Sequence, residues 1–205
     1  MKILCFDTET TGLIKKPQGK WGKDPSFMQS ECWPHVVEIA WALADDDRKT
    51  VLESSYIISP DNWEIPQEAS DIHSITTDFA TANGIDFNIA IDEFMQVLHT
   101  ADIIVGHNVE FDTKVVCAEL YRFKRMDDIP ALKTKNNICT KNVSTNFCKI
   151  PAPWGGNNYK WPTLSELYRK LFTKEIENAH RAMSDVKATL ECFYELEKRG
   201  VIHLV

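Results

Sequence analysis

Long hydrophobic runs are missing from this 205-residue sequence. No apolar stretch is long enough to span a membrane, and the one at the N-terminus extends only a few residues before Asp7, which argues against a secretory signal. The six cysteines are scattered and none belongs to a C-x-x-C pair, so neither a zinc site nor a disulfide framework is expected. We therefore expect a cytoplasmic protein with reduced thiols and no membrane partner.

Internal repeats, low-complexity segments and linkers that would divide the chain are also absent. A length of 205 residues, with 43% hydrophobic and 26% charged residues, is typical of one soluble globular domain, so we expect a single domain over 1–205. The net charge of −7 argues against a nucleic-acid partner, because such proteins are usually basic. That objection weakens if several of the carboxylates bind metal ions.

Hydrophobic periodicity predicts strands and helices that alternate along most of the chain. One predicted helix begins with a capping box of Thr163 and Glu166, and another has an apolar stripe that starts at Ile89. We expect strands over 2–7, 35–45, 50–60, 101–108 and 137–140, helices within 69–84 and over 89–100, 109–123, 163–172 and 181–198, and a loop over 151–162.

Three strands followed by alternating helices and strands indicate an α/β fold, with a mixed central sheet of five strands and helices on both faces. Active sites in such sheets gather at strand ends and adjoining helix starts. Asp7 and Glu9 end the first strand, and Asp112 begins the helix after the fourth. Asp185 lies in the first turn of the last helix, just after His180. This topology can bring the five residues together.

The D-x-E pattern of Asp7 and Glu9 has two interpretations. Successive side chains of a strand point to opposite faces, so these two carboxylates share a face while Thr8 turns away. Two acids on one face repel each other unless a positive charge lies between them. The pair is therefore either a solvated strand end or half of a metal site.

Three segments, "FDTETTGL", "GHNVEFD" and "HRAMSD", resemble the three motifs of the DEDDh class of proofreading-type 3′–5′ exonucleases, which have a ribonuclease H-like fold. The third has a histidine five positions before its aspartate, as in that class. The sister class has a tyrosine four positions before the aspartate, where this chain has Arg181. The resemblance runs nearly end to end and includes "VVEIAW", "HSIT" and "WPTLSELYRKLF".

The resemblance implies that Asp7, Glu9, Asp112 and Asp185 bind two divalent cations, Mg²⁺ or Mn²⁺, which prefer carboxylate oxygens. Asp7 would bridge both ions, Glu9 and Asp185 would hold the ion beside the attacking water, and Asp112 the other. His180 would remove the proton of that water, a role suited to imidazole. The product would be a nucleoside 5′-monophosphate. His107 is assigned to structure instead, because the carboxylates suffice as ligands.

Substrate contacts follow from the same resemblance, with one departure: Ser74 replaces the glycine of the family's H-G-I segment. The lysine- and aromatic-rich stretch over 14–34 could also line the path of the nucleic acid, although such a segment is more often only a surface loop. The implied contacts are Thr10, Leu13, His73, Ile75, Asn108 and Phe111, and the stretch carries Lys15, Lys16, Lys20, Lys23, Trp21, Phe27 and Trp33.

The expected function is a metal-dependent 3′–5′ exonuclease acting on the single-stranded or frayed 3′ end of DNA. Two alternatives stay open: an RNA-trimming enzyme of the same class, since the choice depends on how the pocket treats the 2′-OH, and a non-catalytic nucleic-acid-binding subunit that kept the fold. The chain ends soon after its last helix, so we expect a stand-alone enzyme. A polymerase partner is possible, but no docking tail is visible in the sequence.

Overall fold

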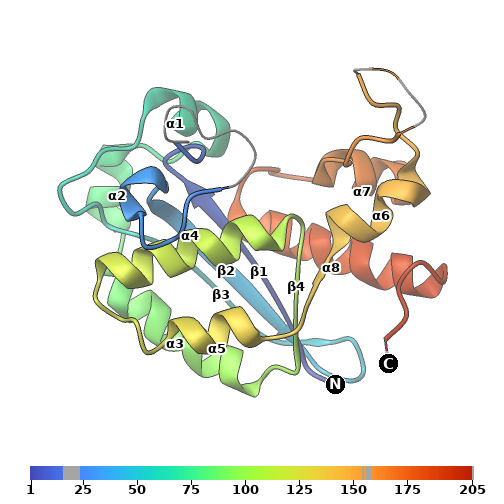
Figure 1. The fold of residues 1–205 in the computed structure, drawn as a ribbon, viewed down its shortest axis with the longest axis horizontal. Helices are drawn as coiled ribbons and strands as arrows, with labels where there is room; N and C mark the ends of the chain where they lie inside the picture. Colours follow the sequence, from blue (N-terminus) through green and yellow to red (C-terminus); the bar gives the residue numbers. More distant parts are fainter. Residues whose placement is uncertain (16–23, 154, 156–157, 205) are drawn as a thin grey trace.

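A five-stranded sheet forms the centre of the computed structural model, which describes residues 1–15, 24–153, 155 and 158–204 (Figure 1). Its strands are β1 (Ile3–Thr10), β2 (Val36–Ala44), β3 (Thr50–Ile57), β4 (Ile103–Gly106) and β5 (Asn137–Cys139), in the order β3-β2-β1-β4-β5. β2 runs antiparallel to β1 and β3, whereas β4 is parallel to β1 and β5. The predicted mixed sheet is confirmed.

Alternate residues of the sheet build two cores, one on each face. Leu4 and Phe6 of β1 pack with α3 (Phe87–Thr100), α4 (Val109–Arg122) and α5 (Ile129–Thr134). Ile3 and Cys5 point to the other face and pack with α6 (Thr140–Cys148), α7 (Leu164–Phe172) and α8 (Ala182–Lys198). The helices α1 (Gln67–His73) and α2 (Thr77–Asn83) form a smaller cluster near the start of β2. Helices therefore cover both faces, as predicted.

Two helices of the structure were not predicted, and one predicted core position is wrong. α5 begins at Ile129-Pro130, with proline in the first turn where its missing N–H costs nothing, and α6 follows β5 directly. Ile89 is 62% exposed, because α3 begins at Phe87 and buries Phe87, Ala90 and Ile91 instead. Pattern alone did not resolve which residue opens the apolar stripe.

In the lysine- and aromatic-rich stretch over 14–34, two aromatic residues are described, and neither offers a fully exposed ring for stacking. Trp33 is buried in the core, and its Nε1–H donates to the Ser26 carbonyl at 3.1 Å. The half-buried ring of Phe27 has the Lys133 ammonium 4.9 Å from its centroid. Burial excludes Trp33 from the nucleic-acid path, which was the less favoured interpretation of this stretch. Lys16, Lys20, Trp21 and Lys23 lie outside the described residues.

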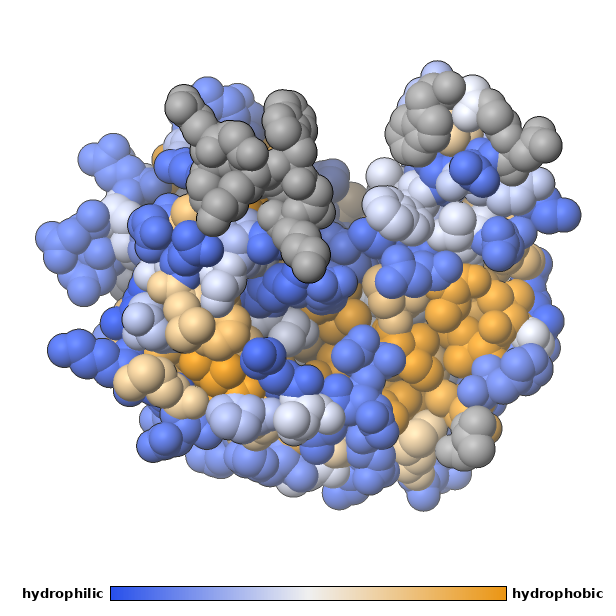
Figure 2. All heavy atoms as spheres, in the orientation of Figure 1, coloured by the Kyte–Doolittle hydropathy of each residue, from blue (hydrophilic) through white to orange (hydrophobic). Residues whose placement is uncertain are grey.

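The surface in Figure 2 is mostly hydrophilic on the side shown, with an apolar area over α6 and α8 where the second core reaches solvent. All six cysteines are free thiols. In the described part of the chain, no helix combines the length and the apolar character that crossing a membrane requires.

Candidate active site

The end of β1 carries two predicted metal ligands on one face. β1 extends to Thr10, three residues beyond its predicted end, so Asp7 and Glu9 both lie within the strand. They continue the alternation of the residues that pack against α8, and Asp185 lies in the first turn of that helix. One carboxylate oxygen from each of the three acids lies within 4.8 Å of the others. One cation could bind all three.

Asp112 reaches the same strand end from the opposite face of the sheet. It lies in the first turn of α4 and is only 4% exposed. Its Oδ1 accepts two hydrogen bonds from Thr8, one from the backbone N–H at 3.1 Å and one from the hydroxyl at 2.7 Å. Because Thr8 points toward α4 while its two neighbours point toward α8, the four carboxylates straddle β1. Three converge, and the fourth is held beside them by Thr8.

Burial and mutual repulsion disfavour ionisation of all four acids. Burial raises the pKa of Asp7 well above its ordinary value, and the charges of Asp112, Asp185 and Glu9 raise it further. The same causes raise the pKa of Glu9 to about 8. Burial raises the pKa of Asp112 to about 7, against the hydrogen bonds from Thr8, and that of Asp185 to about 6. Arg181 and His180 offset the rise only in part, and among the described residues no ion pair reaches Asp7, Glu9 or Asp185, so a bound cation would supply the missing positive charge.

His180, the predicted general base, lies in the loop before α8 and is exposed. Its backbone is left-handed, with φ of 65°. The charge and the backbone of His180 oppose the rise in the pKa of Asp185, which puts the histidine next to that acid. His180 and His73 line one cavity of about 570 Å³. His180 therefore lies next to Asp185 and faces a cavity that none of the four predicted metal ligands lines.

Glu38 of β2 lines the same cavity and fixes the segment that follows His180. The Nε and Nη2 atoms of Arg181 donate to its two carboxylate oxygens at 3.1 and 3.0 Å, and the backbone N–H of Ala182 donates at 3.1 Å. The Ser55 hydroxyl adds a fourth hydrogen bond at 3.0 Å. Glu38 thereby ties the start of α8 to the central sheet.

Sequence reasoning gave Glu38 no role, although a signal was present. The nine residues Val36–Ala44 of β2 are all buried, and Glu38 is the only charged one among them. A buried charge needs a partner, so an acid inside an apolar strand predicts a basic residue somewhere else in the fold. Arg181, 143 positions away, is that residue.

The predicted substrate contacts at the end of β1 and the start of α4 remain predictions, and their surroundings differ. Leu13 is 82% exposed, and Thr10 donates its hydroxyl to the Gly12 carbonyl at 2.8 Å. Asn108 has a left-handed backbone with φ of 77°, and its Oδ1 accepts a hydrogen bond from the Lys141 ammonium. Phe111 is half-buried and packs against the first core. Leu13 is thus the freest of these side chains to meet a base.

His73 ends α1 with its ring buried. Its Nδ1 accepts a hydrogen bond from the Ile75 backbone N–H at 3.1 Å, which puts the proton of the neutral ring on Nε2. Burial lowers the pKa of His73, against the effect of the Thr10 backbone nearby. Within the described residues Nε2 is a buried donor that lacks a hydrogen bond of normal geometry, and the Thr10 backbone lies near it.

Ser74 and Ile75 complete the segment that matches the family's H-G-I. Ser74 has φ of 61°, so it adopts the left-handed conformation that glycine adopts readily, and the chain path survives the departure from the motif. The Ile75 side chain is buried in the cluster around Val37. Packing explains that side chain, so a contact with substrate would have to come from its backbone.

His107 has both ring nitrogens engaged. Nε2–H donates to the Pro162 carbonyl at 3.1 Å, and Nδ1 lies 2.9 Å from the Thr140 hydroxyl, which can donate to it. Burial lowers the pKa of His107 to about 4, so the ring is neutral. These contacts fit the structural assignment of His107, because no lone pair is left for a metal.

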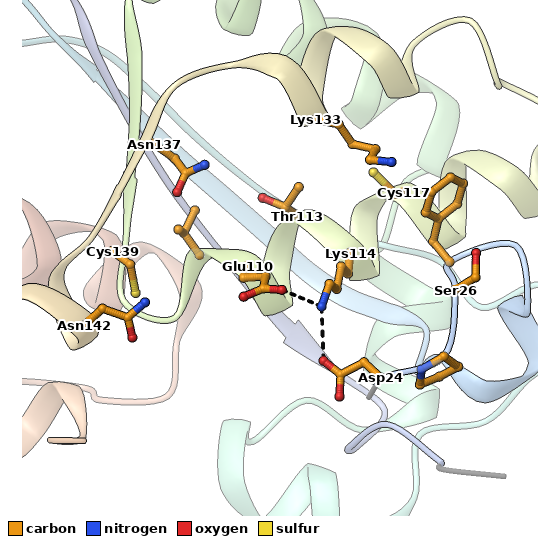
Figure 3. Close-up of a pocket in the computed structure, with 13 residues that line it drawn as sticks. Asp24, Ser26, Glu110, Thr113, Lys114, Cys117, Lys133, Asn137, Cys139 and Asn142 are labelled. Atoms are coloured by element: carbon orange, nitrogen blue, oxygen red, sulfur yellow. Dashed lines mark hydrogen bonds and ion pairs between the residues drawn. The ribbon is translucent and has the colours of Figure 1, made fainter. Parts of the chain in front are cut away.

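A second cavity, of about 530 Å³, lies along a different face of α4 (Figure 3). Lys114 pairs there with Glu110 at 2.6 Å and with Asp24 at 3.2 Å. None of the four predicted metal ligands lines this cavity. It also shares no lining residue with the cavity of His180 and His73, and its lysine is paired with two acids of its own walls.

The RNase_T exonuclease family model matches residues 4–193, a span that contains all three motifs and the four carboxylates. The chain belongs to this exonuclease family. The match confirms the DEDDh class that the motifs resembled and the expectation of a metal-dependent nuclease. No curated protein matches the sequence.

Structures of E. coli exonuclease I have the same fold. The complex with a dT13 oligonucleotide is 20% identical with a TM-score of 0.69, covering 96% of this chain and 41% of that one. The zinc-ion-bound complex with single-stranded DNA is 20% identical with a TM-score of 0.71, covering 97% and 41%. The complex with a dA16 oligonucleotide is 20% identical with a TM-score of 0.67, covering 96% of this chain and 41% of that one. This chain thus spans 41% of exonuclease I, and the likeness confirms the ribonuclease H-like fold.

Proposed function

We propose that residues 1–205 form one exonuclease domain that hydrolyses phosphodiester bonds from the 3′ end of a DNA strand and releases nucleoside 5′-monophosphates. The observation that carries this proposal is the convergence of Asp7, Glu9 and Asp185 within 4.8 Å, with Asp112 held beside them by Thr8. Membership of the exonuclease family supports the class of reaction.

The four carboxylates would hold two divalent cations, Mg²⁺ or Mn²⁺. Carboxylate oxygens are the donors that these ions prefer, and the raised pKa values mark a cluster that is short of positive charge. Asp7 would contact both ions, Glu9 and Asp185 one of them, and Asp112 the other. When bound, the ions would lower the pKa of a coordinated water and stabilise the charge that develops on the phosphate.

His180 would accept the proton of the attacking water. Its place beside Asp185, in a loop that Glu38 anchors through Arg181, supports this role. Its exposure leaves the ring free to orient once substrate fills the cavity, and catalytic hydrogen bonds often form only then.

The 3′-terminal nucleotide would lie between the carboxylates and the cavity of His180 and His73. His73 Nε2–H would donate to the nucleotide, and Leu13 would contact its base. Structures of exonuclease I with dT13 and dA16 support a single-stranded DNA substrate.

The test is digestion of 5′-labelled single-stranded DNA, duplex DNA and RNA of one sequence, with Mg²⁺ and with EDTA. We expect stepwise shortening of single-stranded DNA from its 3′ end, arrest by EDTA, and digestion roughly 10³-fold slower by a matched Asp7→Asn variant. Internal cuts, loss from the 5′ end or activity in EDTA would overturn the proposal. Faster digestion of RNA would overturn the assignment to DNA.

A further inference from the structure

The loop between α6 and α7 carries an exposed tryptophan that the proposed function does not use. Trp161 is 64% exposed and lies between the end of α6 and the start of α7. The residues on either side are anchored: Lys160 N–H donates to the Ile150 carbonyl at 2.9 Å, and the Pro162 carbonyl accepts from His107 at 3.1 Å. The indole is therefore presented to solvent on a segment that the protein holds in place.

The side chains next to Trp161 point back to the protein or away from it in alternation. The Lys160 ammonium binds Glu166 of α7, with N–O distances of 2.6 and 2.8 Å. Tyr159, which pairs with Pro151 in an isolated bridge, is 40% exposed. Lys160 thus fastens the segment to α7, while the aromatic residue on each side of it faces solvent.

A cation lies against the indole. The Lys141 ammonium is 4.8 Å from the centre of the Trp161 ring and also donates a hydrogen bond to Asn108 Oδ1. These two contacts fix the charge between the aromatic ring and the start of α4. An aromatic face with an adjacent cation is the combination that single-stranded nucleic acid recognises through its bases and phosphates.

The position of this pair relates it to the carboxylate cluster. Asn108 immediately precedes α4, and Asp112 follows one turn later, so the two are neighbours on the helix surface. Asp112 is bonded to Thr8 at the end of β1. A strand whose 3′ end lies on the carboxylates can therefore continue past Lys141 onto Trp161.

We propose that Trp161 and Lys141 form a platform for the part of a single-stranded nucleic acid that lies upstream of its 3′ end. A base stacks on the indole, and a phosphate approaches Lys141. The platform rests on the proposed function, because it assumes that the 3′ end lies at the carboxylates. Because every base has an aromatic face, the platform would bind strands that are long enough to reach it, whatever their base sequence.

The test compares kcat/KM of Trp161→Ala and wild type on oligo-dT and on a dT dinucleotide, which is too short to reach the platform. We expect the ratio of oligo-dT to dinucleotide kcat/KM to fall about tenfold, mainly through KM. Trp161→Phe should restore much of the ratio. Lys141→Gln should lower it and weaken its dependence on salt. Ile89→Ala, which removes an equally exposed apolar side chain from α3, is the control and should leave the ratio unchanged.

An equal loss on both substrates, or no loss on either, would overturn the platform. Binding of fluorescein-labelled oligo-dT in EDTA, followed by anisotropy, separates this proposal from the catalytic one. A wild-type chain that binds oligo-dT through Trp161 in EDTA, but does not degrade it when Mg²⁺ is added, would support the platform and refute the proposed function.

Discussion

Two sets of acids in this protein, one buried and one half-buried, have opposite surroundings. Glu38 is 2% exposed and receives Arg181 and a backbone N–H. Glu119 is 3% exposed and is arranged in the same way: Arg122 lies 3.0 Å from its Oε1, which also accepts the backbone N–H of Val36. Each carboxylate joins elements that are distant in sequence.

Asp7, Glu9 and Asp185 form the second set. In the part of the chain that the structure describes, the arginines near buried acids pair with Glu38 and Glu119, and no ion pair reaches these three. The pKa values of all three are raised. Acids with protein partners hold the fold together, whereas acids left without them are available to charges from outside.

The largest expected effect is a loss of catalysis when an acid of the second set is replaced. Asp7→Asn should lower kcat/KM by roughly 10³-fold, or about 4 kcal/mol of transition-state stabilisation, because it removes the central carboxylate. The same variant should unfold at a higher temperature than wild type in EDTA at about pH 8, since a repelled, buried charge is gone. An Asp7→Asn variant that is both active and destabilised would place Asp7 with the structural acids.

The next effect concerns the base beside the cluster. His180→Ala should lower kcat by about 10²–10⁴-fold while leaving the affinity for Mn²⁺, measured by calorimetry, nearly unchanged. His99→Ala, which removes an exposed histidine from the end of α3, is the matched control and should retain activity. Loss of Mn²⁺ binding in His180→Ala would assign His180 to the metal site instead.

The structural set is tested by Glu38→Ala. Removing a buried acid with a bidentate arginine should cost about 2 kcal/mol in urea unfolding, below the full cost of breaking a buried pair because Arg181 can regain water. Glu53→Ala is the control: its partner Lys187 also lies in α8, but both side chains are about half exposed, so we expect less than about 1 kcal/mol. If Glu38→Ala and Glu53→Ala lower the free energy of unfolding equally, the buried ion pair is no more important to stability than the exposed one.

The smallest expected effect is the pH dependence of stability without metal. The carboxyl pKa values are raised in the folded state, so the folded chain binds more protons than the unfolded chain between about pH 4 and pH 8, and stability falls as pH rises through that range. The Tm in EDTA should therefore decrease from about pH 5 to pH 8, and Mg²⁺ should flatten the curve. The same slope with and without Mg²⁺ would contradict the cation-binding role of the cluster.

Much of the fold was predictable because its signals are local. Alternation along β1 puts Asp7 and Glu9 on one face, and the capping box of Thr163 and Glu166 forms as predicted at the start of α7. α8 also begins within one residue of its predicted start, which puts Asp185 in its first turn. The three motifs led to the family that the match over 4–193 confirms.

Other features depended on contacts between distant segments. The burial of Trp33, the pairing of Glu38 with Arg181 and the cation beside Trp161 each join residues that no local pattern relates. α6 was missed because two of the three residues that it buries, Thr140 and Ser144, are polar, and because β5 runs directly into it.

By itself, the sequence determined the family, the five strands, most of the helices, and the identity of the acids at the strand end, because motif and periodicity are properties of neighbouring residues. Only the tertiary structure decided that Asp112 joins from the opposite face through Thr8, and which buried acids receive an arginine. The physical reason is that charge compensation is settled by what folding brings within a few ångströms, whatever the separation along the chain.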